Sequence, residues 1–344
     1  MTTESHAIRE ADAGDWLAIA ALLGRPSSAA RELSRHLLTE YDPGIALVAT
    51  APGAAEARTV DGSTAPQVAG AVIAGIPRTQ ALGTPSDERQ ARLVWISVAP
   101  PQRRCGLGTR LLGAALDELR TRGATRVTLT VDGKEIEALA LFRATGFELE
   151  SQDLGLVLPP EGVARLAAKS APLAGAEIRP LGLDDVPLLI GLLIQLGLER
   201  AEAPHDTLEA LTPAQVEHWL QNPGTVAFAA WEQDDPRTPL GIAWASRRRD
   251  DTVLRFVAVH DDHRRRGIGI ALLVSLAQHV ALPNVNSAQG GTGSAAPALQ
   301  RPLRAPLNEP GDEQEFFRAL GFEVERITYR MARALRGKSA GPQP

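Results

Sequence analysis

Three short motifs occur twice along the chain in the same order, and this internal repeat limits the possible folds more than any other feature. The two copies of each motif are separated by 170, 161 and 175 residues. Such separations are too long for a solenoid and fit two copies of one domain, as does the length of 344 residues at about 150 per domain. The motif pairs are Ala7-Ile8-Arg9-Glu10 with Glu177-Ile178-Arg179-Pro180, Arg103-Arg104-Cys105-Gly106-Leu107-Gly108 with Arg264-Arg265-Arg266-Gly267-Ile268-Gly269, and Phe142-Arg143-Ala144-Thr145-Gly146-Phe147-Glu148 with Phe317-Arg318-Ala319-Leu320-Gly321-Phe322-Glu323.

Prolines indicate where the first copy ends and the second begins. Pro159-Pro160 follows an apolar strand pattern, and Pro172 precedes the second copy. We therefore expect an N-terminal module at 1–159, a linker at 160–175 with a short helix near Val163 to Lys169, a C-terminal module at 176–336 and a tail at 337–344. The Asn, Ser, Gly and Pro residues of Pro283 to Ala298 predict a surface loop that lengthens the second copy.

Hydrophobic periodicity predicts an α/β fold with a mixed sheet in each half. The helix after the glycines has the same apolar spacing in both halves: Leu111, Leu112, Ala115, Leu116 and Leu119, then Leu272, Leu273, Leu276, Ala277 and Val280. The predicted helices are 15–23, 27–38, 108–122, 135–144, 185–196 and 213–220. The predicted strands are 45–50, 68–76, 92–98, 126–131, 154–158, 225–231, 240–246 and 252–259.

Composition narrows the classes of protein. The net charge of −5 argues against a dedicated nucleic-acid binder, and the single Cys105 argues against a disulfide or a thiolate metal cluster. The N-terminus lacks a signal-peptide pattern, and the longest apolar run, Val186 to Leu198, is short of the roughly 20 residues that span a bilayer. We expect a cytoplasmic protein without nucleic-acid or membrane partners and without a metal.

The repeated Arg-x-x-Gly-x-Gly motif predicts a pyrophosphate-binding turn. It follows a strand that ends at Val98 or Val259, and a helix begins directly after it. A helix N-terminus offers free N–H groups, and glycine lets the backbone approach an anion. Leu111 and Leu272 replace the third glycine of a dinucleotide fingerprint, and the Gly-Lys-Ser at 337–339 has Ala332 where a P-loop needs glycine. A plain tight turn explains one copy equally well, whereas two copies in matching contexts favour ligand binding.

These motifs resemble the GCN5-related N-acetyltransferase (GNAT) superfamily, with two tandem modules over nearly the whole chain. Val98 to Gly108 and Val259 to Gly269 match its acetyl-coenzyme A motif, and Ala144 to Phe147 and Ala319 to Phe322 match its closing motif. The resemblance implies mostly antiparallel sheets flanked by helices. It implies acetyl-CoA as co-substrate, bound between two splayed strands without a metal. The binding residues it implies are Val98, Arg103, Arg104, Cys105, Gly106, Leu107, Gly108 and Thr109, then Val259, Arg264, Arg265, Arg266, Gly267, Ile268, Gly269 and Ile270.

The resemblance also implies direct acetyl transfer to an amine, but the usual acid is missing. Phe142 and Phe317 occupy the position at which many relatives have a tyrosine that protonates the leaving thiolate. Ser97 and Tyr41 are candidate donors in the first module, and Tyr329 in the second. Glu135 is the candidate base. Each of these is also explained as a structural residue, and so are the other nearby acids, Asp132, Glu137, Glu309 and Asp312.

Two classes of function remain open. The first is an N-acetyltransferase acting on a primary amine of a small molecule or a peptide, including a protein N-terminus, and working as a monomer or homodimer. The second is an acyl-CoA-binding protein in which one or both modules are non-catalytic. Arg247-Arg248-Arg249-Asp250-Asp251 is predicted to be a charged hairpin tip, with contact to an anionic acceptor as the alternative. Cys105, His260 and His263 are expected to be loop residues beside the turns.

Overall fold

The structure is a computed structural model. It describes residues 6–26, 28–50, 68–78, 89–170, 173–195, 212–235, 237–281, 301–308 and 311–335. The predicted loop at Pro283 to Ala298, the tail at 337–344 and the candidate acid Glu309 lie outside the described residues.

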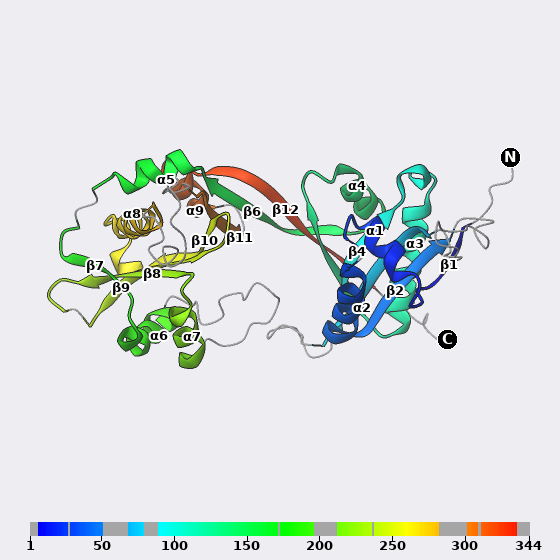
Figure 1. Ribbon diagram of the computed structural model, residues 1–344, viewed down its shortest axis with the longest axis horizontal. Helices are drawn as coiled ribbons and strands as arrows, with labels where there is room; N and C mark the ends of the chain where they lie inside the picture. Colours follow the sequence, from blue (N-terminus) through cyan, green and yellow to red (C-terminus); the bar gives the residue numbers. More distant parts are fainter. Residues whose placement is uncertain are drawn as a thin grey trace, which may run out of the picture. The chain divides into compact units, whose positions relative to one another are not determined.

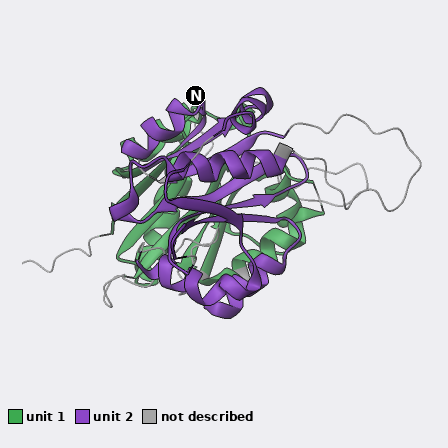
Figure 2. Ribbon diagram, turned by 90° about the vertical axis from the view of Figure 1, so that its left-hand side faces the viewer, with its two compact units in different colours: residues 1–151, 328–344 green, residues 152–327 purple. Residues whose placement is uncertain are grey.

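The chain forms two units, of which the first is made of two separate stretches of sequence. Unit 1 contains residues 1–151 and 328–344, and unit 2 contains residues 152–327 (Figure 2). The two boundaries fall inside β6 (Glu148–Leu158) and inside β12 (Glu323–Ala334). The modules 1–159 and 176–336 remain a prediction about how the sequence is duplicated. The two folded units differ from these modules, because the last strand of each module pairs in the other unit.

Unit 1 is a sheet with helices on both faces, and its elements follow the sequence expectations closely. Its sheet has the order β1-β2-β3-β4-β5-β12, with β4 and β5 parallel and the other described pairs antiparallel. The strand β1 was not predicted. The elements are β1 Ala7–Glu10, α1 Trp16–Leu22, α2 Ala29–Glu40, β2 Tyr41–Thr50, β3 Val68–Pro77, β4 Gln90–Val98, the 3-10 turn Pro100–Gln102, α3 Leu107–Thr121, β5 Arg126–Asp132 and α4 Ile136–Ala144.

Unit 2 repeats this plan. Its sheet has the order β6-β11-β10-β9-β8-β7, with β10 and β11 parallel. The linker helix, α5, begins at Pro160 instead of Val163, and β7, β11, α9 and β12 were not predicted. The elements are α5 Pro160–Ala167, β7 Ala176–Pro180, α6 Val186–Gln195, α7 Pro213–Gln221, β8 Thr225–Glu232, β9 Pro239–Arg247, β10 Thr252–Val259, α8 Ile268–Ala281, β11 Leu303–Asn308 and α9 Asp312–Ala319.

Both faces of each central sheet are covered, and the sequence of β3 shows why. Val72, Ala74 and Ile76 pack in the core beneath α3, whereas the alternate residues Ala71 and Ile73 pack in the core beneath α1 and α2. Because side chains of a strand alternate between faces, a strand buried on both faces is apolar at nearly every position. In unit 2, α8 lies on one face and α6 and α7 lie on the other (Figure 1).

The predicted apolar face of the helix after the glycines is confirmed in both units. Leu111, Leu112, Ala115, Leu116 and Leu119 of α3 are all buried. In α8 the equivalent residues Leu272, Leu273, Leu276 and Ala277 are buried, and Val280 packs against the same core. This spacing places the whole apolar stripe on one side of the helix, against the sheet.

Each unit completes its sheet with a strand from the other half of the sequence. In unit 1, residues 328–334 of β12 pair with β5, and Met331 and Leu335 are buried in its core. In unit 2, residues 153–158 of β6 pair with β11, and Leu154, Leu156 and Leu158 are buried in its core. The strand that follows each repeated Gly-Phe motif therefore crosses from one unit to the other.

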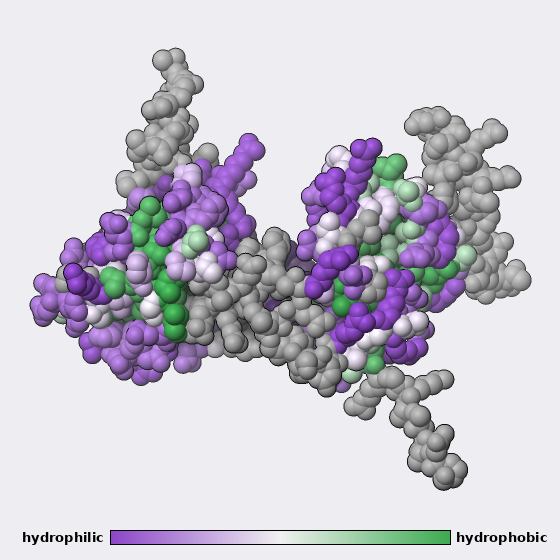
Figure 3. Space-filling view, turned by 90° about the horizontal axis from the view of Figure 1, so that it is seen from below, coloured by the Kyte–Doolittle hydropathy of each residue, from purple (hydrophilic) through white to green (hydrophobic). Residues whose placement is uncertain are grey.

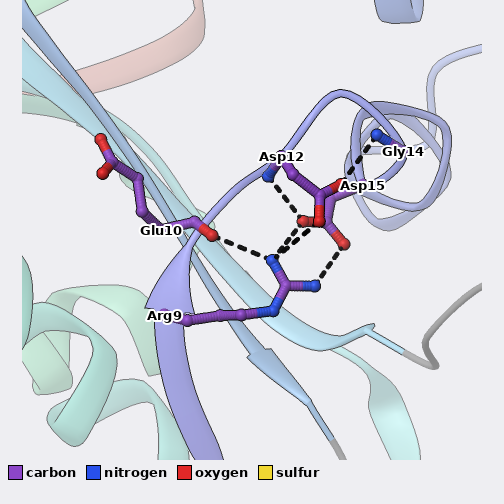
Figure 4. Close-up of polar contacts among 5 residues, drawn as sticks. All are labelled: Arg9, Glu10, Asp12, Gly14 and Asp15. Atoms are coloured by element: carbon purple, nitrogen blue, oxygen red, sulfur yellow. Dashed lines mark hydrogen bonds and ion pairs between the residues drawn. The ribbon is translucent and has the colours of Figure 1, made fainter. Parts of the chain in front are cut away.

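A buried ion pair fixes the first strand of each unit to the segment that follows it. Arg9 donates two hydrogen bonds to Asp15, at 2.6 and 2.9 Å, and the N–H of Asp12 donates a third (Figure 4). Arg179 and Asp185 repeat the arrangement at 2.9 and 2.8 Å. Asp15 and Asp185 are among the few buried charged residues of the described chain. The first repeated motif is thus explained by its arginine.

The Arg9–Asp15 pair should contribute stability that depends on pH. Burial opposes ionisation of Asp15, but the bonds from Arg9 and from the Asp12 N–H outweigh it and lower the pKa of Asp15. A carboxyl whose folded pKa is lowered stabilises the fold above its unfolded pKa, about 3.9. We expect Asp15→Asn to destabilise unit 1 by about 2 kcal/mol at pH 7. The difference from the wild type should shrink as the pH falls below about 4.

The measurement is hydrogen exchange of β1 and α1 peptides at pH 7, with urea unfolding followed from pH 7 to pH 3. Asp12→Asn is the matched control, because Asp12 lies 3.6 Å from Arg9 but is 68% exposed. Its loss should change stability by less than about 0.5 kcal/mol. Equal effects of the two substitutions would contradict the assignment.

Candidate functional site

The two predicted turns have the same backbone conformation. In unit 1, Arg104 has φ 65° and Gly106 has φ 77°; in unit 2, Arg265 has φ 61° and Gly267 has φ 84°. Arg104 and Arg265 are the only non-glycine residues with positive φ in the described parts of the chain. A left-handed arginine is uncommon. Its occurrence at equivalent positions of both units indicates that the turn geometry is required.

The first arginine of each motif holds the turn against the end of the strand. Arg103 donates a hydrogen bond from Nε to the carbonyl of Val98 at 3.0 Å. Arg264 donates in the same way to the carbonyl of Val259 at 3.2 Å. The repeated motif predicts an arginine at this position, but it does not predict this hydrogen bond. The bond gives Arg103 and Arg264 a structural role in addition to the predicted binding role.

Each turn presents a row of backbone N–H groups. The Arg110 N–H is bonded to the Gly106 carbonyl at 3.1 Å, and the Ala271 N–H to the Gly267 carbonyl at 3.0 Å. No backbone partner is found within the described residues for the N–H groups of 104–109 or 265–270. These groups begin a helix, where the dipole favours an anion. The geometry is that of an anion cradle, and the binding of CoA by these backbone groups stays a prediction.

The strand before each cradle parts from its parallel neighbour. The strands β4 and β5 pair only from Gln90 to Arg92, although β4 continues to Val98. In unit 2, β10 and β11 pair only at Thr252 and Val253, although β10 continues to Val259. A register shift interrupts each strand just after it parts, at Val94 and at Arg255. Such bulges bend a strand, so the same bulge opens both gaps.

The end of each parted strand turns its backbone toward the gap. The Ala99 N–H is bonded to the Ala69 carbonyl at 2.8 Å, and the His260 N–H to the Leu240 carbonyl at 2.8 Å. Neighbouring N–H groups of a strand point in opposite directions. The N–H groups of Val98 and Val259 therefore point away from the paired strand and into the gap, as a ligand between splayed strands would need.

A further glycine pair, which the sequence motifs did not reveal, lets the helix approach the strands. Gly70 is paired with Val98, and Gly241 with Val259. A Cβ at Gly70 would lie 2.8 Å from a methyl of Leu111, and one at Gly241 would lie 2.8 Å from the Ala258 carbonyl. A Cβ at Gly241 would collide with the backbone, and one at Gly70 would require Leu111 to shift. The signal was available in the sequence, since both glycines lie in the apolar strand before the motif strand.

The phenylalanines at the usual tyrosine position belong to the cores. Phe142 is 4% exposed and packs edge-to-face against Phe147. Phe317 is 5% exposed and packs in the same way against Phe322. Neither side chain reaches solvent. The repeated Gly-Phe motif is thus explained by core packing behind α4 and α9.

The candidate catalytic residues Ser97, Glu135 and Tyr329 have different surroundings, and the fourth candidate, Tyr41, is buried. Ser97 donates its hydroxyl proton to the Leu22 carbonyl at 3.0 Å, which ties β4 to the end of α1. Glu135 is exposed at the start of α4, where Arg104 pairs with its neighbour Glu137. Tyr329 is opposite Val131 and packs against the unit 1 core. Its expected place in the second module is wrong, because the strand exchange carries it into unit 1.

The loop residues beside the cradles have local partners. Cys105 is exposed and its thiol donates to the Gln102 carbonyl at 2.8 Å. His260 and His263 pack edge-to-face at 5.7 Å, and Arg266 contacts His263 Nδ1. Large apolar side chains next to the turns are exposed, namely Ile136 at 74% and Ile270 at 39%.

The described residues contain neither a metal-binding group nor a membrane-spanning helix. Among them no group of three or more His, Cys, Asp or Glu side chains is arranged to hold a metal ion. No described helix combines the length and apolarity needed to cross a membrane. The surface seen in Figure 3 is largely hydrophilic, with smaller apolar areas between.

Comparisons with known proteins agree with this geometry. The family model "Acetyltransferase (GNAT) family" matches residues 31–147 and 195–287, which together are more than half of the chain. A GCN5-related N-acetyltransferase from Sphaerobacter thermophilus is 17% identical, with a TM-score of 0.55 over 98% of each chain. A tandem GNAT protein from the clavulanic acid biosynthesis pathway is also 17% identical, with a TM-score of 0.56 over 99% of this chain and 100% of its own. None of the curated proteins compared matches the sequence.

The structural likenesses, at this identity, establish the fold, and the matched model establishes the family. The fold is the predicted one, with two α/β units of mixed sheet. The family transfers acyl groups from acyl-CoA to amines, and in each unit the cradle and the parted strands occur together. The chain belongs to the GNAT acetyltransferase family as a tandem member.

Proposed function

We propose that this protein transfers the acetyl group of acetyl-CoA directly to a primary amine. The observation that carries the proposal is the joint presence, in each unit, of an N–H cradle and a strand gap. The pyrophosphate of CoA is assigned to the N–H groups of 104–109 and 265–270. The pantetheine arm is assigned to the gaps, where it pairs with the N–H groups of Val98 and Val259.

Acetyl transfer needs three groups from the protein or its water: a base, a donor to the oxyanion and a proton source for the thiolate. The amine nitrogen forms a bond to the thioester carbonyl carbon as the C–S bond breaks, and the amine loses a proton to a base or to water. A backbone N–H directed into the gap stabilises the negative charge on the carbonyl oxygen. The thiolate that leaves takes up a proton. Glu135 remains the candidate base in unit 1, where its exposure at the start of α4 leaves it accessible to water.

Tyr329 is the candidate acid of unit 1, and the strand register supports a difference between the units at this position. Arg92 is opposite Thr128, and three residues on along β5 Val131 is opposite Tyr329. In unit 2, Val253 is opposite Arg304, and three residues on along β11 Leu307 is opposite Leu154. The exchanged strands thus place a hydroxyl in unit 1 where unit 2 has a leucine. We assign the faster transfer to unit 1.

The same observation favours a second candidate function for unit 2. With Leu154 in place of a tyrosine and with Phe317 buried, unit 2 has no acid at either position. A unit of this kind binds acyl-CoA and transfers slowly or serves as a non-catalytic half. The proposed acceptor remains a small-molecule or peptide amine, and the proposed assembly a monomer or homodimer in the cytoplasm.

One prediction of this proposal concerns the number of acetyl-CoA molecules bound per chain. Calorimetric titration with acetyl-CoA should give two sites per chain in the wild type and one in Gly108→Glu or Gly269→Glu. A Cβ at these glycines meets only ordinary contacts, the nearest at 3.4 and 3.5 Å, so the fold should accept the substitution. The added carboxylate lies at the helix N-terminus and repels the pyrophosphate.

Gly113→Glu is the matched control, because it adds the same charge to α3 where a Cβ meets nothing within 4 Å. It should retain both sites. The absence of any acetyl-CoA binding by the folded wild type would overturn the proposal. Binding without thiol release in the presence of a panel of primary amines would support the non-catalytic alternative.

The next prediction separates Tyr329 from the other tyrosine of the chain. In the Gly269→Glu background, Tyr329→Phe should lower amine-dependent thiol release from acetyl-CoA by about tenfold or more. Acetyl-CoA binding should be unchanged. Tyr41→Phe is the control, since Tyr41 is buried beside His36 and burial raises its pKa. Equal rates of the Gly269→Glu protein with and without Tyr329→Phe would remove Tyr329 from the mechanism.

A further inference from the structure

The two units differ at the bulge where the parallel strands part. In unit 1 the bulge residue is Val94, and Gly75 of β3 lies opposite Arg92. In unit 2 the equivalent bulge residue is Arg255, and Ser246 of β9 lies opposite Val253. Arg255 donates from Nε to the Ser246 hydroxyl at 3.0 Å. The bulge residue is therefore apolar in unit 1 and cationic in unit 2, where the Ser246 hydroxyl orients it.

Arg255 lies at the closed end of the gap. Val253 is the last residue of β10 that pairs with β11, and Arg255 follows two positions later. Val259, next to the cradle, is four residues further along, or about 13 Å at the rise of a strand. The charge of Arg255 is therefore remote from the phosphates assigned to the cradle. A pantetheine arm that starts at the cradle and runs along the gap would direct its reactive end toward Arg255.

Arg255 faces the side of the sheet that carries α6 and α7. Ser246 and Trp244 are two residues apart on β9, so their side chains share a face. Trp244 packs against Trp219 of α7 at 5.1 Å and against Phe256 at 5.8 Å. The aromatic cluster of Trp219, Trp244 and Phe256 therefore lies on the face that Arg255 shares with Ser246, the face that α6 and α7 cover in Figure 1.

The positive charge at this bulge is not neutralised within the described residues. Neither Arg248 nor Arg255 has a carboxylate partner there, and Asp251 at the hairpin tip is held by Arg304 at 2.6 Å. Arg304 is itself bonded to Glu325. Desolvation and the neighbouring charge of Arg248 lower the pKa of Arg255. Arginine nonetheless stays charged at neutral pH, so an anion bound here would relieve the repulsion.

A third arginine adds to this potential. Arg301 donates to the Arg248 carbonyl at 2.9 Å, beside the start of β11. Arg247 has a separate task, because it bonds the His279 carbonyl at the end of α8. The cationic surface is therefore made by Arg248, Arg255 and Arg301, with Arg255 alone positioned at the bulge.

We propose that Arg255, supported by Arg248, binds the oxyanion of an acidic amine acceptor in unit 2, one that carries a carboxylate or a phosphate. The proposal rests on the proposed function, since it gives the acceptor class for the same gap. Unit 1 has Val94 at this position and Trp95 beneath the Arg25 guanidinium at 5.3 Å. Its acceptor lacks the oxyanion requirement, and the two units have different specificities.

The test uses three amines that differ only at one end: 4-aminobutanoate, 3-aminopropylphosphonate and butylamine. Each is titrated calorimetrically into the Gly108→Glu protein saturated with desulfo-CoA, so that only unit 2 is loaded and no transfer occurs. We expect one or both acidic amines to bind at least about tenfold more tightly than butylamine. Arg255→Gln should abolish that preference and leave butylamine binding unchanged. The carboxylate and phosphonate arms identify which oxyanion fits.

Arg249→Gln is the matched control, because Arg249 is exposed on the same hairpin and its loss removes the same charge. It should retain the preference. Equal binding of the three amines, no binding of any, or the same loss in Arg249→Gln would overturn the proposal. Failure of desulfo-CoA itself to bind the wild-type protein would instead overturn the proposed function.

Discussion

The parting of two parallel strands governs the arrangement of everything else in each unit. Once β4 and β10 part from their parallel neighbours beside a bulge, the N–H groups of Val98 and Val259 face a gap instead of a neighbouring strand. Such groups need a hydrogen-bonding partner, and an extended amide-bearing ligand supplies one. The cradle then lies at the open end of the gap and the bulge residue at its closed end.

The turn at the open end depends on arginine as much as on glycine. Arg103 and Arg264 hold the last strand carbonyl, and the following arginine takes a left-handed conformation that glycine would adopt at lower cost. Arginine at this left-handed position, in place of glycine, indicates that its charge is required. In unit 1 that charge is paired with Glu137 at the start of α4, which links the cradle to the helix near the candidate base.

The exchange of closing strands makes the two similar units unequal. Duplication produces two copies with the same cradle, but each sheet is completed by a strand encoded beside the other cradle. Tyr329 therefore lies in the sheet of unit 1, and Leu154 occupies the equivalent place in unit 2. Together with Val94 and Arg255 at the bulges, this gives the units different side chains at the closed end of the gap, while the turns at the open end keep the same conformation.

The sequence by itself determined the duplication, the α/β class, the core face of α3 and α8, and the position of the two strand-to-helix turns. These are local properties: periodicity, a strand-to-helix turn and a glycine spacing repeat within short segments. Tertiary structure alone decided which strand completes which sheet, that Ser97 is tied to Leu22, and that Tyr329 lies in unit 1. Pairing between residues more than a hundred positions apart leaves no short-range pattern, because it is fixed by burial of both faces of the finished sheet.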